Sequence, residues 1–218
     1  MKIHLVSYAC GEYYKNIQRN LSAQGKNFGW INHAYTVDSI RHDPFYTANA
    51  ELLANKRGAG YWCWKPYIIY KTLSNIPEGD IMIYCDASVV IRYDASDYVT
   101  VVVGDKRMMT LATGFTNKDW CKRDCFILMK CDEPRYWNLP QLWAGVIGMR
   151  NDQFSRDFTL EWLNYCIQPN IITDSPSILG DNLDGFTDHR HDQAILTNLA
   201  EKHGIMPEWN HVTFNDIC

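Results

Sequence analysis

Short apolar segments alternate along the chain with longer segments in which apolar residues recur every three or four positions. The short segments are typical of strands buried in a sheet, and the longer ones are typical of helices that cover it. Strands are predicted at 2–8, 28–35, 81–85, 108–112 and 142–149, and a second short β-branched run follows the third of them at 89–91. Helices are predicted at 12–24, 48–54, 67–73, 96–103, 118–130, 154–166 and 194–203, with Gly25 ending the first of them. This alternation predicts the α/β fold class.

The segment 81–91 is the expected centre of the sheet. Its first five residues are dominated by apolar side chains and run directly into Asp86, which would lie at the carboxyl end of the strand. Ligands of open α/β sheets bind outside the carboxyl ends of the strands, so Asp86 is placed to hold a ligand. The small residues Ala87 and Ser88 would let a bulky ligand approach the backbone. Because acids are common in ordinary turns after strands, Asp86 alone is weak support for a site.

Ser7 and Tyr8 end the first predicted strand. If that strand is a neighbour of the central one, both side chains lie beside Asp86. The ring of Tyr8 would then either stack on a nucleotide base or pack in the core, and the sequence favours neither.

The segment before the third predicted helix combines glycines, aromatic residues and cations. Gly58 and Gly60 predict a backbone turn that helix propensity alone would not select. Lys65 lies among four aromatic residues. Either its stem covers the edge of the core while its ammonium reaches water, or its ammonium pairs with a phosphate, with Arg57 as a second phosphate partner.

The second half of the chain has three features of interest. Gly145 lies inside the predicted strand 142–149, where it indicates either close approach of a ligand to the backbone or a bulge. Residues 170–187 read as a long loop, and long loops in compact domains are often lids or binding loops. Asp192 falls in the first turn of the last helix, where the helix dipole favours an anion even without a catalytic role.

Length and composition limit the classes of protein to consider. With 218 residues, 46% hydrophobic and 21% charged, the chain suits one globular domain. The net charge of -4 argues against non-specific binding to nucleic acid. No apolar stretch approaches the roughly 18 residues that cross a bilayer. We therefore expect a cytoplasmic protein without a transmembrane segment.

Eight cysteines are scattered along the chain without paired CxxC spacing. In a reducing compartment they are expected to be small buried hydrophobic residues. A zinc knuckle built on Cys121, Cys125 and Cys131 is the alternative, but the sequence has no matching second half for it.

Four motifs carry a resemblance to a known family. They are GlyTyrTrpCysTrpLysProTyrIleIle (60–69), TyrCysAspAlaSer (84–88), AspSerProSer (174–177) and PheThrAspHisArgHisAspGlnAlaIleLeu (186–196). In this order they resemble a glycosyltransferase family of GT-A type found in bacteria and large DNA viruses. The chain as a whole is similar to the glycosyltransferase domains encoded by large algal viruses of the chlorella type.

The resemblance implies one GT-A, Rossmann-like domain over residues 1–218, with a mixed, mostly parallel central sheet flanked by helices. The donor-binding part would be about 1–105 and the acceptor-side part about 106–218. The resemblance further implies a nucleotide-sugar donor, a glycan acceptor and a metal ion, Mn²⁺ or Mg²⁺. A viral enzyme of this kind would act in the host cytoplasm, either as a whole protein or together with further domains of a longer polypeptide.

The expected metal ion would offset the charge that grows on a departing nucleoside diphosphate. Magnesium or manganese needs only one or two carboxylates beside phosphate oxygens and waters. Asp86 and Ser88 match the two ends of the family's DxD motif, with Ala87 between them. Because Ser88 replaces the second acid, we expect it to act through water and His211 in the tail to complete the metal shell. A packed surface histidine is the alternative at position 211.

The resemblance and the residue patterns together assign roles to the other candidates. The donor-binding set is Ser7, Tyr8, Arg57, Lys65, Asp86, Ala87 and Ser88. The acceptor-side set is Asp188, His189 and Gly145, and the catalytic set is Asp192 and His191. Asp192 would take the proton of the acceptor hydroxyl if the transfer inverts the anomeric centre, or stabilise the oxocarbenium-like centre if it retains it.

The expected function is metal-dependent transfer of a hexose, such as glucose, galactose or rhamnose, from a nucleoside-diphosphate sugar to a glycan. UDP is the expected nucleotide. A glycoside hydrolase with two carboxylates across a cleft would explain the aromatic residues without a metal, but it gives Lys65 no role. A non-catalytic sugar- or nucleotide-binding module would explain why Ser88 replaces an acid.

Overall fold

The computed structural model describes residues 1–208 and 214–216. The strands are β1 (Ile3–Ala9), β2 (Ile31–Thr36), β3 (Ile81–Cys85), β4 (Val89–Ile91), β5 (Met108–Thr116), β6 (Pro140–Arg150) and β7 (Phe214–Asp216). The longer helices are α1 (Gly11–Asn27), α6 (Trp64–Leu73), α7 (Ser96–Lys106), α10 (Gln153–Cys166) and α12 (His191–Lys202). The short ones are α2 (Val37–Ile40), α3 (Pro44–Ala48), α4 (Ala50–Leu53), α5 (Gly58–Tyr61), α8 (Arg123–Leu128), α9 (Pro134–Trp137), α11 (Pro169–Ile172) and the 3-10 turn η1 (Asn117–Asp119). Within these described ranges, no helix combines the length and the apolarity that a bilayer span requires.

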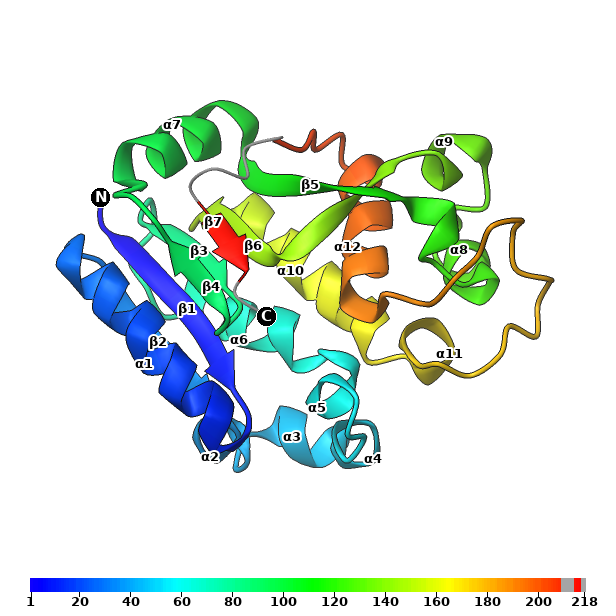
Figure 1. The fold of residues 1–218 in the computed structure, drawn as a ribbon, viewed down its shortest axis with the longest axis horizontal. Helices are drawn as coiled ribbons and strands as arrows, with labels where there is room; N and C mark the ends of the chain where they lie inside the picture. The colour runs from blue at the N-terminus through cyan, green and yellow to red at the C-terminus, as the bar shows by residue number, and fades with distance from the viewer. Residues whose placement is uncertain (209–213, 217–218) are drawn as a thin grey trace.

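Five strands form one sheet in the order β2-β1-β3-β6-β5 (Figure 1). β1 pairs in parallel with β2 and β3, whereas β6 pairs antiparallel with β3 and β5. Four of the five strands therefore run in one direction and only β6 is reversed. This arrangement confirms the predicted α/β fold with a mixed, mostly parallel sheet. β4 and β7 pair separately as two antiparallel strands.

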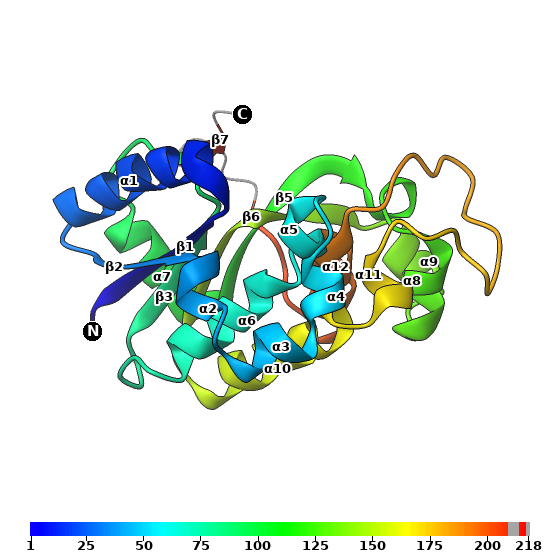
Figure 2. The ribbon, with the colours of Figure 1, turned by 90° about the horizontal axis from the view of Figure 1, so that it is seen from below.

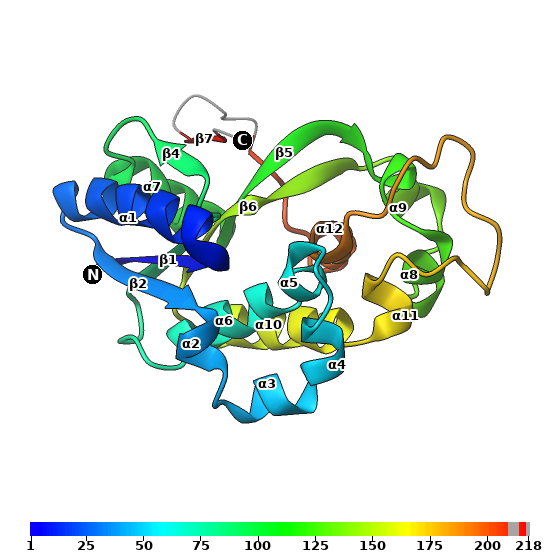
Figure 3. The ribbon, with the colours of Figure 1, turned by 60° about the horizontal axis from the view of Figure 1, so that its bottom comes forward.

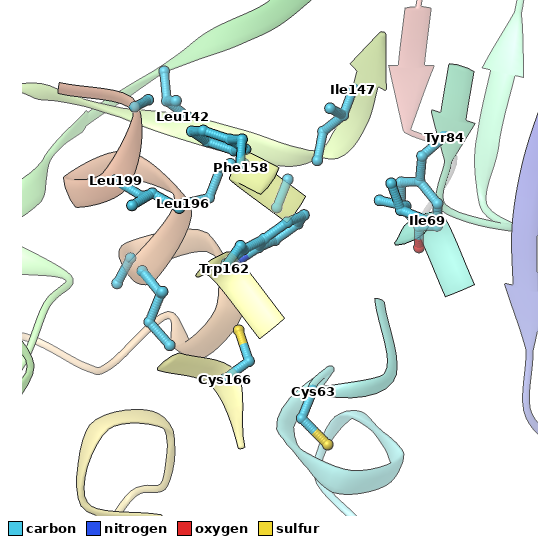
Figure 4. Close-up of a cluster of buried hydrophobic side chains, with 14 of the residues drawn as sticks. Cys63, Ile69, Tyr84, Leu142, Ile147, Phe158, Trp162, Cys166, Leu196 and Leu199 are labelled. Carbon is cyan, nitrogen blue, oxygen red and sulfur yellow. The ribbon is translucent and has the colours of Figure 1, made fainter. Parts of the chain in front are cut away.

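The sheet separates two apolar cores, because alternate residues of a strand point to opposite faces. Val6 packs in a core with α6, α10 and α12, whereas Leu5 packs in a core with α1 and α7. Figure 3 shows α1 and α7 on one side of the sheet and α6 and α10 on the other. Figure 4 shows members of the first core from four elements: Tyr84, Ile147, Phe158, Trp162, Leu196 and Leu199. Burial of each large apolar side chain stabilises the fold by about 1.5–3 kcal/mol.

Four short helices, α2 to α5, connect β2 to α6 in succession (Figure 2). The sequence predicted one helix at 48–54, but the structure divides this region into α3 and α4. Asn49 leaves the helical region with a φ of -118°, and its side-chain Nδ2 donates to the carbonyl of Phe45 at 2.9 Å. This side-chain bond offers the backbone an alternative to a continuous helix.

Two other predicted helix boundaries are wrong. α1 continues through Gly25, where the missing side chain lets the helix approach β1: a Cβ at Gly25 would lie 2.7 Å from Leu5 Cδ2. The predicted helix 118–130 is interrupted between η1 and α8. Lys122 is extended there, and its backbone N–H donates to His189 Nδ1 at 3.2 Å. In both places a contact with a distant segment overrides the local pattern.

The long loop predicted at 170–187 begins with the short helix α11 and is then held against α8. The buried Lys122 ammonium donates to the carbonyl of Thr173 at 2.9 Å. The buried Asp124 carboxylate accepts from the backbone N–H of Ile178 at 3.0 Å. Two buried charged side chains of one short segment thus fix the course of this loop.

α5 is a left-handed turn, since the φ angles of the five consecutive residues 58–62 lie between 51° and 102°. Each left-handed residue other than glycine costs about 1–2 kcal/mol. The indole Nε1 of Trp64 donates to the carbonyl of Gly58 at 2.9 Å and helps to hold the turn. Gly60 lies so close to α4 that a Cβ there would come 2.8 Å from Leu53 Cα. The turn predicted from the two glycines is confirmed.

Replacing Gly60 with alanine should destabilise the protein. The new Cβ would lie 2.8 Å from Leu53 Cα and 3.2 Å from the Leu52 carbonyl oxygen, and φ at this position is +102°. We expect Gly60→Ala to lower the free energy of unfolding by at least about 2 kcal/mol in urea denaturation. Gly114→Ala is the matched control, because φ at Gly114 is not left-handed and a Cβ there meets no atom within 4 Å. Equal stability of the two variants would contradict this account of the turn.

Candidate active site

Tyr8 and Asp86 lie at the same edge of the sheet. β1 and β3 pair in parallel with Val6 opposite Tyr84, and Tyr8 and Asp86, each two residues further along its chain, line the same pocket. The predicted neighbourhood of the first and central strands is confirmed. After Asp86 the chain turns, and the Val89 N–H donates to the Asp86 carbonyl at 2.9 Å. The predicted place of Asp86 at the carboxyl end of the central strand is confirmed, and the second apolar run of the segment is β4, with residues 86–88 in the turn between the two strands.

The ammonium of Lys65 lies between two carboxylates at this edge. Its Nζ is 3.4 Å from Asp86 Oδ1 and 2.8 Å from Asp192 Oδ2, and it donates to the Ala144 carbonyl at 3.1 Å. The Lys65 side chain is 3% exposed. Burial by itself would lower the pKa of Lys65, but Asp192 and Asp86 together raise it above its usual value. A charged lysine is therefore a fixed part of this site.

Asp86 is held on one of its two carboxylate oxygens. Tyr84, two residues earlier on the same strand face, donates its hydroxyl to Oδ1, the oxygen that also faces Lys65. The backbone N–H of Asp86 donates to the Gly145 carbonyl at 2.8 Å. Among residues 1–208 and 214–216, Oδ2 has no partner, and the Asp86 side chain is 29% exposed. One oxygen of Asp86 thus remains available to a ligand.

Asp192 is buried in the first turn of α12, with 3% of the residue exposed. Its Oδ2 contacts the Lys65 ammonium as a close ion pair without good hydrogen-bond geometry. Its backbone carbonyl accepts from Trp162 Nε1 at 3.0 Å, which fixes the start of the helix on α10. Burial raises the pKa of Asp192 from 3.8 to about 6, although Lys65 opposes the shift.

A pocket of about 430 Å³ opens beside Asp86. Its lining comes from the ends of β1 and β3 and from the left-handed turn: Tyr8, Cys10, Tyr14, Lys56, Gly58, Ala59, Trp62, Trp64, Asp86, Ala87 and Ser88. Tyr8 stacks on Trp64 with ring centroids 3.9 Å apart. Ser7 lies beneath, buried, and accepts from Gln18 Nε2 at 3.1 Å. The pocket is wide enough for part of a nucleotide sugar.

The cation that lines this pocket is Lys56, which the sequence analysis did not select. Arg57 instead turns to two acids: it pairs with Asp188 and lies 3.2 Å from Asp174 Oδ1. Because Lys65 is enclosed and Arg57 is paired, a direct contact of either with a donor stays a prediction. No local signal distinguished Lys56 from Arg57, since the turn that follows decides which side chain faces the pocket.

His191 lies between Asp174 and the aromatic wall of the pocket. Its Nδ1 bonds with the Ile172 carbonyl at 2.7 Å, and its Nε2 lies 3.5 Å from Asp174 Oδ1. Its ring stacks on Trp62 with centroids 5.5 Å apart. Burial lowers the pKa of His191, which favours the neutral ring. His191 adopts a φ of +49°, a left-handed value that places strain beside the catalytic candidates.

His189 and Gly145, both predicted on the acceptor side, have internal partners. His189 accepts at Nδ1 from the Lys122 N–H and donates from Nε2 to the Ile171 carbonyl at 2.8 Å. Burial holds the pKa of His189 well below its usual value. Gly145 lies in a bulge of β6, one of the two predicted alternatives, and the Trp143 indole covers it. Contact of either residue with an acceptor stays a prediction.

The residues at the pocket fit a divalent ion only in part. Asp86 offers one free oxygen, and the Ser88 hydroxyl lines the same pocket. His211 lies outside the described residues. Among the residues that the structure describes, no group of three or more His, Cys, Asp or Glu side chains is arranged to hold a metal ion. These residues therefore suit a magnesium- or manganese-type ion that phosphate oxygens hold in large part.

Comparison with known proteins gives matches in structure only. No protein-family model matches the chain, and no curated protein sequence matches it. A glycosyltransferase involved in glycosylation of the major capsid of PBCV-1 is 8% identical, with a TM-score of 0.46 over 75% of this chain and 66% of that one. Mouse xyloside xylosyltransferase 1 is 10% identical, with a TM-score of 0.49 over 96% and 85%. Galactosyltransferase LgtC is 15% identical, with a TM-score of 0.48 over 90% and 70%.

The chain thus spans 66% of the length of the viral enzyme. At identities of 8 to 15% and TM-scores of 0.46 to 0.49, these likenesses assign no donor, acceptor or reaction to the chain.

Sequence reasoning selected neither Tyr84 nor Asp174 individually, although each begins a motif named above, at 84–88 and at 174–177. Tyr84 had a further usable signal, because a residue two positions before Asp86 on a strand shares its face. Nothing local indicated the partners of Asp174, since Arg57 and His191 come from distant segments.

Asp192 should make the stability of the protein depend on pH. Its pKa is about 6 in the folded chain and 3.8 unfolded, so between these values only the folded chain keeps the proton. The stabilisation is complete below pH 3.8 and is lost as pH rises through 6, by about 3 kcal/mol. We expect the wild type to lose most of this amount relative to Asp192→Asn between pH 4 and 7 in urea denaturation. Parallel pH curves for the two proteins would contradict the assignment.

Proposed function

We propose that this protein is a glycosyltransferase that moves a hexose from a nucleoside-diphosphate sugar, with UDP as the expected nucleotide, to a glycan acceptor. One observation carries the proposal. A buried lysine, Lys65, holds the carboxylates of Asp86 and Asp192 at the carboxyl edge of the sheet, beside a pocket of about 430 Å³. The resemblance of the sequence motifs to GT-A glycosyltransferases supports the same conclusion.

The pocket supports binding of the donor. Tyr8 and Trp64 give it an aromatic wall, and Lys56 gives it a cation for the diphosphate. The turn that contains Ala87 and Ser88 gives it a floor of small side chains. A Mn²⁺ or Mg²⁺ ion held by Asp86, with Ser88 acting through water, would neutralise charge on the departing diphosphate. The free Oδ2 of Asp86 would be the oxygen that holds this ion, and the ion would in turn orient the diphosphate.

Asp192 and His191 support the transfer step. The raised pKa of Asp192, about 6, suits a base that takes a proton near neutral pH. Lys65 would stabilise the Asp192 carboxylate after the proton leaves and orient it at the same time. His191, next to it in the chain, would position the pocket wall through its stacking on Trp62.

The rival functions fit these contacts less well. A glycoside hydrolase needs two carboxylates that face one sugar, whereas both acids here turn an oxygen toward the same buried ammonium. A non-catalytic binding module has no use for a buried carboxylate with a pKa of about 6. We therefore propose neither as the function.

Replacing Asp86 with asparagine should abolish use of the donor. The change removes the charge that faces the pocket and keeps the side-chain shape. We expect Asp86→Asn to lower transfer from UDP-sugars about 100-fold or more and to weaken the thermal stabilisation by UDP with manganese. The exposed Asp97→Asn is the matched control and should leave both unchanged. Full transfer activity in Asp86→Asn would disprove the donor role of this residue.

Replacing Asp192 with asparagine should separate turnover from donor binding. If Asp192 is the base, Asp192→Asn loses about 100-fold or more in kcat. Its donor affinity, measured by calorimetry, should stay near that of the wild type, because Asp192 does not line the pocket. The kcat of the wild type should rise with pH through about 6. A pH-independent kcat over this range would argue against the role of a base.

A further inference from the structure

An exposed arginine lies on two aromatic rings directly before the catalytic candidates. Arg190 Cζ is 4.3 Å from the ring centroid of Trp120 and 5.9 Å from that of Phe115. The two rings lie 5.0 Å apart, and Phe115 is 47% exposed. We call these three residues the Arg190 shelf. None of them has a role in the function proposed above.

The guanidinium of Arg190 is held in place but has free donors. The Arg190 backbone N–H donates to the Trp120 carbonyl at 3.0 Å, which fixes the arginine over the indole. Within the described ranges 1–208 and 214–216, the guanidinium has neither a hydrogen bond nor an ion pair with protein. By contrast, Arg57 pairs with Asp174 and Arg123 pairs with Asp132. Arg190 therefore presents a planar fork of N–H groups to the solvent.

Such a fork is suited to one class of ligand. A stacked guanidinium binds carboxylate or phosphate through two parallel charge-assisted hydrogen bonds, and it loses little entropy because stacking has already fixed its plane. The half-exposed ring of Phe115 adds an apolar surface beside it, against which the C–H face of a sugar ring packs. The shelf thus combines the two contacts that an acidic sugar requires.

The position of the shelf relates it to the proposed transfer. Arg190 comes two residues before Asp192, so their Cα atoms are at most about 7 Å apart. His191 lies between them, and its ring stacks on Trp62 at the wall of the pocket. A saccharide on the shelf would therefore lie near the start of α12, the helix whose first turn contains Asp192.

We infer that the Arg190 shelf binds the acceptor, and that this acceptor carries a carboxylate or phosphate group. The identification of the bound ligand as the acceptor rests on the function proposed above. The binding of an anionic sugar does not, because it depends only on Arg190, Trp120 and Phe115.

Binding of three small probes, without nucleotide, tests the inference. Methyl glucuronide carries a carboxylate, glucose 6-phosphate carries a phosphate, and methyl glucoside is neutral. In NMR titration of the full chain we expect at least one of the two anionic probes to bind about tenfold more tightly than methyl glucoside. The stronger of the two identifies the group that the shelf recognises. Equal binding of all three probes would overturn the inference.

Variants link this preference to the shelf. Arg190→Gln should remove the preference for the anionic probe, and Arg190→Lys should restore it only in part, since lysine keeps the charge without the planar fork. Arg135→Gln is the matched control, because Arg135 also lies on a ring, that of Tyr136, but faces its own acid, Glu133. An unchanged preference in Arg190→Gln would overturn the inference, provided that its melting temperature matches that of the control.

The outcome is distinguishable from failure of the proposed function. If no UDP-sugar binds, the glycosyltransferase proposal fails while the probe titration still reports on the shelf. If transfer occurs, Arg190→Gln should raise the KM for the acceptor about tenfold and leave the KM for the donor unchanged. An unchanged acceptor KM would remove the shelf from the acceptor site without affecting the assignment of Asp86.

Discussion

The buried ammonium of Lys65 connects the parts of this structure that matter for its chemistry. Lys65 lies in α6. Its partner Asp86 follows β3, Asp192 lies in the first turn of α12, and Ala144 lies in β6. Burial of one charge is costly, and burial of a single carboxylate beside it would not balance all three N–H groups of the ammonium. Two acids and a carbonyl together do so. Asp86 and Asp192 are consequently parts of one electrostatic unit.

Two irregular pieces of backbone make this unit possible. The left-handed turn at 58–62 places Trp62 on His191 and leads directly into α6. Lys65 of this helix then points toward the carboxyl edge of the sheet. The bulge of β6 leaves the carbonyls of Ala144 and Gly145 free to face Lys65 and Asp86. Strained or irregular backbone is tolerated where surrounding contacts determine it, and such places are frequently functional.

Three cations contact residues in or near the start of α12. Lys65 faces Asp192, Arg57 reaches Asp188, and Arg190 lies over Trp120. Only the last of these cations lacks an acid among the described residues. The difference suits a site in which two cations organise the protein and the third is left for a ligand.

The sequence by itself determined the fold class and the place of the central acid. Runs of apolar residues long enough for buried strands, alternating with helical periodicity, require an α/β sheet, and Asp86 follows the central run. Gly58 and Gly60 likewise predicted the turn at 58–62, because left-handed backbone favours glycine. The predicted helix boundaries were wrong at Gly25 and Lys122, because contacts with the distant residues Leu5 and His189 override the local helix preference there.

Only the tertiary structure decided which charge meets which. Nothing near Lys65 in the chain indicates that it joins Asp86 to Asp192, that Lys56 rather than Arg57 faces the pocket, or that Arg190 keeps a free guanidinium. The physical reason is that pairing of buried charges depends on which side chains the whole core brings together away from water. The local sequence determines which charged side chains are present, whereas packing determines which of them pair.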